Sequence, residues 1–281
     1  MRLPLALGLL CCLALFAAPS ANAIPPFATL WTVSPGVDAP GVNADCTPTA
    51  AHPDPVVLVH GTWMDRTTSW VLMGEKLIAD GYCVFALDYG NRGTQPVADS
   101  AAELATFVDA VRQRTGAAKV AIVGHSQGGM MPRYYLKFGG GIDKVSELIG
   151  LAPSNHGSAN GSGFGEYAAE YGDSPAAGDQ LAGSPFMQKL NGDGVDAPQP
   201  GSGEIDYTVI STRNDEIVTP YTSQALAGPA SVVTNIVVQD KCPEDQVEHI
   251  ALPYDPVAVQ WVENALGRPG PADPAFQPTC A

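Results

Sequence analysis

A serine lies at the centre of a Gly-x-Ser-x-Gly sequence near the middle of the chain. Residues 124–128 (GHSQG) follow the apolar, β-branched run Val120–Val123 and precede a helical pattern. Placed between a strand and a helix, such a sequence forms a sharp turn that exposes the serine hydroxyl, and its glycines let helix and strand pack closely. We therefore predict that Ser126 is a nucleophile.

A serine hydroxyl reacts poorly unless a base removes its proton and an acid orients that base. For a serine in this kind of turn, the order along the chain is serine, then acid, then histidine. Two histidines follow the serine, His156 and His249. His156 precedes every suitable acid, whereas His249 lies after the last predicted strand and before the closing helix. His249 is therefore the predicted general base.

The acid is expected on the loop after the strand at Tyr207–Ile210. Asp215 lies in a polar turn just beyond that strand. The neighbouring Glu216 is the alternative, although successive side chains alternate in direction there. Asp240 and Asp245 are too close to the histidine in sequence to come from a separate strand end. We predict Asp215 as the acid of a serine–histidine–aspartate triad.

Two backbone N–H groups are needed to stabilise the negative charge that develops on an attacked carbonyl oxygen. One is expected from Gln127, directly after the nucleophile. The other is expected from the loop after the strand Val56–Val59, where Gly61 lets the backbone turn and Thr62 offers its N–H. The alternative is that this loop is an ordinary turn after a strand. The combination with the serine turn favours an oxyanion hole formed by Thr62 and Gln127.

These residues must be positioned by a sheet and its helices. Short apolar, β-branched runs alternate with helical patterns, which indicates βαβ units and a parallel sheet. We predict an open, doubly wound α/β sheet of about six strands flanked by helices. The predicted strands are Val56–Val59, Cys83–Leu87, Val120–Val123, Leu148–Leu151, Tyr207–Ile210 and Ser231–Val238. The predicted helices cover Ala101–Arg114, Gly128–Phe138 and Pro256–Leu266.

One segment, Ser154–Gly203, is rich in Gly, Ser, Asn and Asp and separates the fourth predicted strand from the fifth. Long loops of this kind are either disordered or functional. We predict a cap or lid over the site. Phe186, Met187 and Leu190 recur on one face of a short helix that could cover the site, although such a face more often packs onto the core.

The first 23 residues have the pattern of a secretory signal peptide. Arg2 precedes the apolar stretch Leu3–Ala18, and Ala21–Ala23 gives the small-x-small pattern of a cleavage site. The alternative is a membrane anchor, but Pro4 and Pro19 bracket an apolar run of about 15 residues, shorter than the roughly 20 that a spanning helix needs. We expect a mature, extracellular protein of one domain over residues 24–281.

The mature chain is strongly acidic. Without Arg2, 13 basic residues stand against 29 acidic ones, so the net charge is about −16 with neutral histidines. Such a surface repels nucleic acid and anionic membranes and favours solubility. We expect no nucleic-acid partner and a monomer.

Four cysteines lie outside the predicted signal peptide: Cys46, Cys83, Cys242 and Cys280. An even number in an exported chain favours disulfides, and four cysteines allow three pairings. Free buried thiols are the alternative. No CxxC or histidine-rich spacing suggests a metal site, so we expect none.

Five segments, in order, resemble the class 2 bacterial lipases and, more distantly, the fungal lipase B type. They are residues 55–62 (PVVLVHGT), 124–129 (GHSQGG), 152–158 (APSNHGS), 180–191 (QLAGSPFMQKLN) and 212–220 (TRNDEIVTP). The resemblance implies an α/β-hydrolase fold and hydrolysis of acylglycerols or similar lipid esters through an acyl-enzyme, without a cofactor. The implied substrate is a lipid or small ester.

The resemblance also implies details that the residues alone leave open. It places His156-Gly157-Ser158 on a loop near the site, as a structural or pocket element, and it pairs Cys46 with Cys83 and Cys242 with Cys280. The chain departs from the family in the short segment before its first strand, so we expect one or both opening antiparallel strands to be missing. No clear calcium cluster is visible, although the acidic residues 193–196 leave that question open.

Two other functions fit the same residues. A polyester-directed esterase, or an acyltransferase acting on cell-envelope lipids, would use an identical triad. From a different class, an inactive hydrolase fold could serve as a binding protein, but a complete triad in the required order argues against it.

Overall fold

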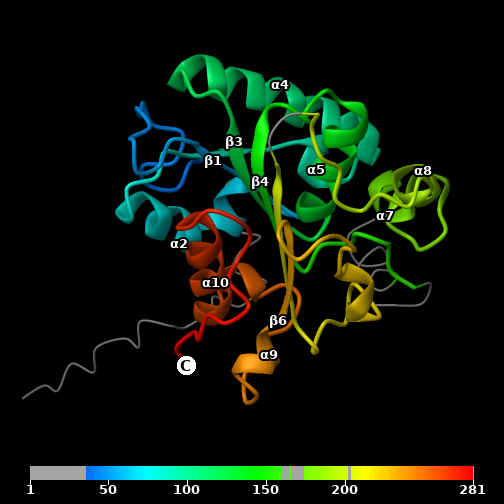
Figure 1. The fold of residues 1–281 in the computed structure, drawn as a ribbon. Helices are drawn as coiled ribbons and strands as arrows, with labels where there is room; N and C mark the ends of the chain where they lie inside the picture. Colours follow the sequence, from blue (N-terminus) through cyan, green and yellow to red (C-terminus); the bar gives the residue numbers. More distant parts are fainter. Residues whose placement is uncertain (1–35, 160–164, 166–173, 202–203, 281) are drawn as a thin grey trace, which may run out of the picture.

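The chain folds around a central parallel sheet with helices on both faces (Figure 1). The computed structural model describes residues 36–159, 165, 174–201 and 204–280. The strand order is β2-β1-β3-β4-β5-β6 and every neighbouring pair is parallel. This arrangement confirms the predicted doubly wound α/β sheet. The strands are β1 (Val56–Val59), β2 (Val84–Leu87), β3 (Val120–His125), β4 (Val145–Leu151), β5 (Asp206–Ser211) and β6 (Val233–Val237).

Helices cover the sheet because its strands are apolar on both faces, as parallel strands usually are. The longer helices are α2 (Arg66–Ala79), α4 (Val97–Thr115), α5 (Gln127–Phe138) and α10 (Pro256–Leu266). The short ones are α3 (Gly90–Gly93), α7 (Pro175–Asp179), α8 (Pro185–Asn191), α9 (Val238–Lys241) and the 3₁₀ turns η1 (Tyr221–Gln224) and η2 (Leu252–Tyr254).

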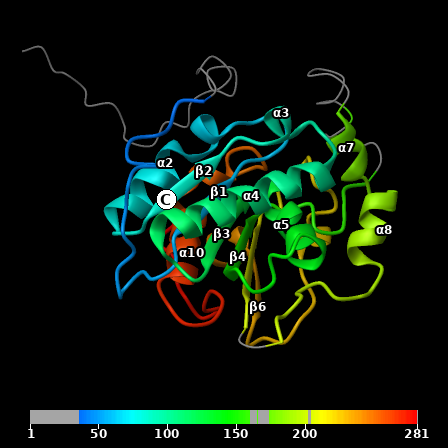
Figure 2. The ribbon, with the colours of Figure 1, turned by 90° about the horizontal axis from the view of Figure 1, so that it is seen from above.

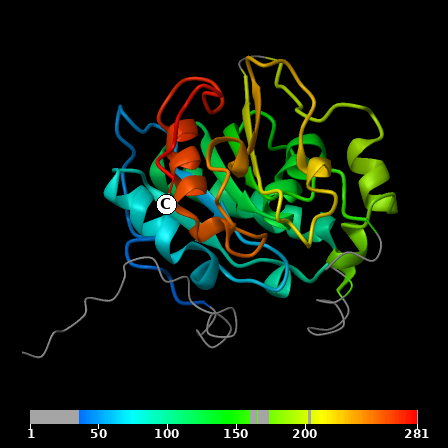
Figure 3. The same ribbon diagram turned by 90° about the horizontal axis from the view of Figure 1, so that it is seen from below.

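Two separate hydrophobic clusters lie on the two faces of the sheet. Side chains of α4 and α5, such as Leu104 and Met130, belong to one cluster. Side chains of α2 and α10, such as Trp70 and Trp261, belong to the other. Figure 2 shows α4 and α5 on one side of the sheet, and Figure 3 shows α10 on the other. The sheet is therefore the middle layer of three.

The sequence interpretation placed no helix between the first two strands, where the structure has α2. Its N-cap, Asp65, accepts hydrogen bonds from the backbone N–H groups of Thr67 and Thr68. Trp70, Met73 and Leu77 are buried at helical spacing. The N-cap residue and this spacing are helix signals that the sequence carries locally. By contrast, α10 begins at Pro256 and ends at Leu266, as predicted.

The described part of the predicted cap contains α7 and α8. On α8, Phe186, Met187 and Leu190 are buried in the same cluster as α5, and the Phe186 ring stacks on Tyr134 at 5.2 Å between centroids. The apolar face of α8 thus packs onto the core, which was the alternative to a covering lid. Residues 160–164, 166–173 and 202–203 of the predicted cap lie outside the described residues, as does the predicted signal peptide.

Two disulfides fasten the ends of the described chain. Cys46 bonds to Cys83, directly before β2, and Cys242 after α9 bonds to Cys280 near the C-terminus. This is the pairing that the resemblance implies. In residues 36–280, as far as the structure describes them, β1 is the first strand. Among the described helices, none combines the length and apolar character that crossing a membrane requires.

Candidate active site

Ser126 occupies a tight turn between β3 and α5. Its backbone has φ 56° and ψ −122°, a conformation that L-residues rarely adopt and that marks the strained serine turn. A Cβ atom on Gly124 would lie 1.9 Å from the carbonyl oxygen of Gly128, and one on Gly128 would lie 2.1 Å from that of Val59. Glycine is therefore required at both positions for β1, β3 and α5 to approach this closely.

The loop after β1 lies directly beside the serine. A Cβ atom on Gly61 would be 3.2 Å from the Cβ of Ser126. The hydroxyl of Tyr89 donates to the carbonyl oxygen of His60 at 2.6 Å, and this hydrogen bond stabilises the loop. Thr62, whose backbone N–H is predicted to be an oxyanion donor, is the next residue along this loop.

The two residues of the predicted oxyanion hole contact each other through their side chains. The hydroxyl of Thr62 donates to Oε1 of Gln127 at 2.8 Å, and both residues are buried. Gln127 is also the first residue of α5. The structure thus brings together a residue of the loop after β1 and the first residue of α5.

His249 and Asp215 form a buried pair. Nδ1 of His249 lies 2.7 Å from Oδ2 of Asp215. The carbonyl oxygen of His249 accepts a hydrogen bond from Nε2 of His125 at 2.9 Å, so the loop that carries the predicted base rests against the residue before Ser126. His249 and Asp215 therefore meet beyond the carboxyl ends of the strands, where α/β sheets place their sites, and the His249 loop contacts the residue that precedes Ser126.

Within the described residues, the Asp215 carboxylate accepts four hydrogen bonds. Its Oδ1 accepts from the backbone N–H groups of Ile217 and Val218 at 2.9 and 2.7 Å. Its Oδ2 accepts from His249 and from Nε2 of Gln224, each at 2.7 Å. It is this aspartate, and not the exposed Glu216, that binds the histidine. Gln224 was not predicted, because nothing in its local sequence marks it.

Burial and charge act in opposite directions on this pair. Burial raises the pKa of Asp215, but the charge of His249 and the hydrogen bonds to the carboxylate outweigh it and lower that pKa overall. Burial lowers the pKa of His249, but the charge and hydrogen bond of Asp215 outweigh it, and the net pKa is above 6.5.

Two other buried histidines behave differently from His249. Burial lowers the pKa of His60 to about 4 and that of His125 to about 3, so both stay neutral at pH 7.

The second histidine after the serine, His156, lies in a different cluster. Its Nε2 is 3.1 Å from Oδ1 of Asp196, and its Nδ1 donates to the carbonyl oxygen of Ser223 at 2.8 Å. Asp196 also pairs with the buried Arg133 on α5. His156 therefore joins three segments together, which fits the structural role that the resemblance implies.

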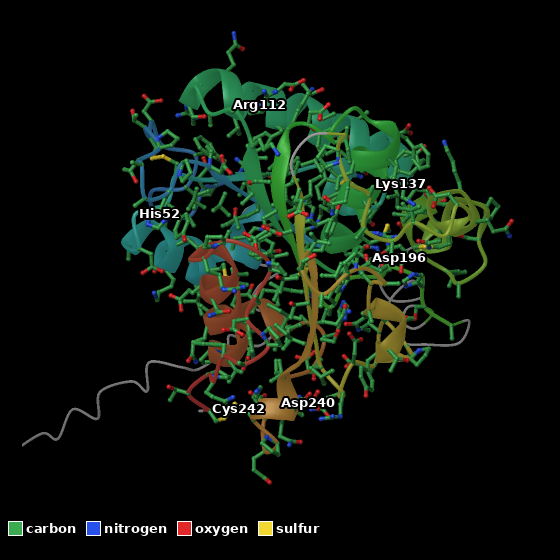
Figure 4. All side chains as sticks on the ribbon, viewed as in Figure 1. His52, Arg112, Lys137, Asp196, Asp240 and Cys242 are labelled. Atoms are coloured by element: carbon green, nitrogen blue, oxygen red, sulfur yellow. A yellow bond between two sulfur atoms is a disulfide. The ribbon has the colours of Figure 1, made fainter. Side chains whose placement is uncertain are left out.

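The acidic residues 193–196, considered for calcium, make ion pairs with neighbouring cations. Lys137 on α5 lies 2.7 Å from Oδ1 of Asp193, and Asp196 binds Arg133 and His156. Figure 4 shows Lys137 and Asp196 on the side of the molecule that carries α5 and α8. Within the described residues, no three carboxylate, histidine or cysteine side chains are grouped as metal ligands would be.

Comparisons with known proteins agree with this architecture. A model of the family "Lipase (class 2)" matches residues 53–262. Among solved structures, Aspergillus fumigatus lipase B is similar with a TM-score of 0.67 and 22% identity, over 86% of this chain and 64% of that one. The mature form of Bacillus licheniformis lipase BlEst2 is similar with a TM-score of 0.56 and 18% identity, over 76% of this chain and 90% of that one. This chain thus spans less than two thirds of the fungal lipase.

Proposed function

Because this chain belongs to the class 2 lipase family, we propose that it is a serine carboxylester hydrolase of lipase type that cleaves acylglycerols or related lipid esters. The buried contact of 2.7 Å between His249 and Asp215, beside the turn that carries Ser126, is the observation that supports this most. An inactive hydrolase fold that only binds a partner would not need such a pair on a loop that contacts the residue before a serine in a strained turn.

The proposed reaction begins when His249 Nε2 takes the hydroxyl proton of Ser126 and the serine oxygen attacks the ester carbonyl. The N–H groups of Thr62 and Gln127 donate to the resulting oxyanion. His249 then gives its proton to the alcohol oxygen as the carbon–oxygen bond breaks, which leaves the acyl group on Ser126. Asp215 holds the imidazole in orientation and stabilises its protonated form.

Water completes the cycle. His249 removes a proton from water as the water oxygen attacks the acyl-enzyme, and the same two N–H groups hold the second oxyanion. Collapse of this intermediate releases the carboxylic acid, and His249 returns a proton to the oxygen of Ser126. The residues named here need no metal or cofactor for either step.

The experiment combines turnover with labelling. The purified mature protein is assayed on p-nitrophenyl esters from acetate to palmitate and on emulsified triacylglycerol, and it is treated with a p-nitrophenyl phosphonate. We expect hydrolysis of the esters and a single phosphonyl group on Ser126, located by peptide mass spectrometry. Absence of both hydrolysis and labelling in a folded protein would reject the proposal and favour a binding protein.

A further inference from the structure

A fully buried glutamine outside the triad contacts both residues of the proposed oxyanion hole. Gln180 follows α7 directly, and its side chain has no exposed surface. Its Nε2 lies 2.9 Å from Oγ1 of Thr62 and 2.9 Å from Oε1 of Gln127. Its Oε1 accepts a hydrogen bond from the hydroxyl of Ser154 at 2.7 Å. We call Thr62, Gln127, Ser154 and Gln180 the amide cluster.

The members of the amide cluster come from four different segments. Thr62 follows β1, Gln127 begins α5, Ser154 follows β4 and Gln180 follows α7. Thr62 also donates to Gln127 at 2.8 Å, so a ring of hydrogen bonds links the first two residues to Gln180. Because the cluster is buried, water does not replace a lost partner, and each bond constrains the others strongly.

Gln180 is itself anchored from outside the cluster. Its Nε2 lies 3.0 Å from the carbonyl oxygen of Ala176 in α7. The hydroxyl of Ser174 donates to the carbonyl oxygen of Thr94 at 2.8 Å, and Asp179 accepts from the backbone N–H of Val97 at 2.9 Å. These bonds fix α7 to the beginning of α4. The amide of Gln180 is thus presented by a fixed element rather than by a free loop.

We propose that Gln180 is a positioning residue that sets the spacing of the two oxyanion-hole N–H groups. The inference rests on the proposed function. Thr62 lies on the loop after β1 and Gln127 begins α5, so the distance between their N–H groups depends on contacts between the two segments, and their side chains supply such contacts. Gln180 holds both, so the donors are already in place when charge develops, and no reorganisation is needed at that moment. Gln180 acts through these residues and not on the substrate.

A purely structural role makes a different prediction. A glutamine that only fills the core would lower stability when replaced, but it would leave the turnover of each folded molecule unchanged. A positioning residue lowers kcat and leaves KM nearly constant, because the oxyanion exists only on the reaction path. Measuring kcat and KM separates the two roles, provided that the concentration of active sites is first determined by titration.

The first variant is Gln180→Met, which keeps the length of the side chain but can neither donate nor accept these hydrogen bonds. We expect kcat on a p-nitrophenyl ester to fall about 10- to 100-fold with little change in KM. The rate at which a phosphonate labels Ser126 should fall by a similar factor, because the tetrahedral adduct places its oxygen in the same hole. Wild-type kcat and labelling rate in a folded variant would overturn the inference.

The matched control is Gln260→Met on α10. The Gln260 side chain makes three hydrogen bonds, to the carbonyl oxygens of Pro256 and Thr279 at 2.9 and 3.0 Å and from the N–H of Thr279 at 2.8 Å. It lies on the α2 and α10 face of the sheet, away from the amide cluster. We expect a lower Tm with unchanged kcat. An equal loss of kcat in this control would overturn the inference, since turnover would then follow stability.

A second variant keeps the inference testable if Gln180→Met does not fold. Ser154→Ala removes the hydroxyl that donates to Gln180 and leaves the packing almost unchanged. We then expect kcat to fall about 2- to 10-fold, the effect of one neutral hydrogen bond, whereas wild-type kcat would overturn the inference. If the proposed function is wrong, the wild-type protein itself will show neither hydrolysis nor labelling of Ser126. That result differs from failure of the Gln180 inference, in which the wild-type protein is active and the variants are equally active.

Discussion

At His249, two opposing influences act on one imidazole. Burial alone would lower its pKa, but the charge and hydrogen bond of Asp215 raise the pKa above 6.5. A histidine whose pKa is raised on folding stabilises the folded protein below pH 6.5, and this contribution is lost as the pH rises through the folded pKa. Catalysis requires the neutral imidazole, so we expect activity to increase over the same interval in which this stabilisation is lost.

Replacement of the acid should reverse the shift of the histidine. In a Ser126→Ala background, Asp215→Asn removes the charge that raises the pKa of His249 and leaves the burial that lowers it. We expect the pKa to fall below 6.5, measured by NMR of the histidine side chains as a function of pH. His156 is an internal control, because its pKa is raised chiefly by its hydrogen bond to Asp196 and should not change. A pKa of His249 that stays above 6.5 would show that Asp215 is not its main partner.

Single and combined substitutions test whether the triad acts as a unit. Ser126→Ala, His249→Ala and Asp215→Ala should each reduce kcat by orders of magnitude, and the losses should not add, because each residue works only through the others. Glu216→Ala is the control and should keep near-normal kcat, since Glu216 is exposed. Near-normal turnover in a folded Asp215→Ala variant would move the role of the acid to another residue.

Among the elements, α8 shows how packing decides between two interpretations of one sequence pattern. Its apolar face could have covered a substrate site, but Phe186 stacks on Tyr134 of α5 and Leu190 has no exposed surface. A helix held in this way adds to the core and has to unpack before it can move. The described part of the predicted cap therefore packs as part of the core.

Truncation of the α8 face should consequently affect stability. We expect Phe186→Ala to lower the free energy of unfolding by about 3 kcal/mol, the lower end of the range for buried phenylalanines, measured by urea denaturation. Phe138→Ala is the matched control: Phe138 also contacts the Tyr134 ring, at 4.8 Å, but is 47% exposed, so its loss should be much smaller. A mobile lid would give the opposite result, with unchanged stability and altered activity on ester droplets.

The two disulfides fasten loops at the ends of the described chain. Each joins cysteines 37 or 38 residues apart, and chain entropy puts the stabilisation at up to about 4 kcal/mol for each bond. We expect the double variant Cys242→Ala with Cys280→Ala to lower Tm and to leave kcat unchanged at moderate temperature. Peptide mapping without reduction should find Cys46 joined to Cys83 and Cys242 to Cys280. A crossed pairing would contradict the structure.

Over the whole molecule, the parallel sheet brings distant residues together. Residues 126, 215 and 249 follow β3, β5 and β6 in turn, and the carboxyl ends of parallel strands lie at one edge of the sheet. The disulfides and the strongly acidic composition are both consistent with the proposed location outside the cell.

Export and processing can be measured directly. When the full chain is expressed in a host that secretes proteins, we expect the protein in the medium to begin at Ile24, as found by N-terminal sequencing, and to elute as a monomer in size-exclusion chromatography with light scattering. The control is a variant with Ala21→Arg and Ala23→Arg, which should stay uncleaved because the cleavage site requires small residues. An N-terminus at Met1 in the secreted wild-type protein would contradict the predicted signal peptide.

The sequence by itself determined the class of fold and the candidate triad. Apolar β-branched runs and helical periodicity are local patterns, so the six strands and α10 could be located without knowledge of their partners. The required order of serine, acid and histidine then left one histidine, and the polar turn after the fifth strand favoured Asp215 over Glu216. Helix α2, which was not predicted, carries local signals of the same kind in its N-cap Asp65 and its buried residues at helical spacing.

Only the tertiary structure decided which polar and apolar side chains meet across the chain. Gln224 and Gln180 are ordinary glutamines in sequence, yet one binds Asp215 and the other joins Thr62 to Gln127. The amphipathic pattern of α8 fits both a lid and a core helix, and only its contacts with α5 distinguish the two. A hydrogen bond or a packed ring depends on the position of a partner far away in sequence, and no local pattern carries that position.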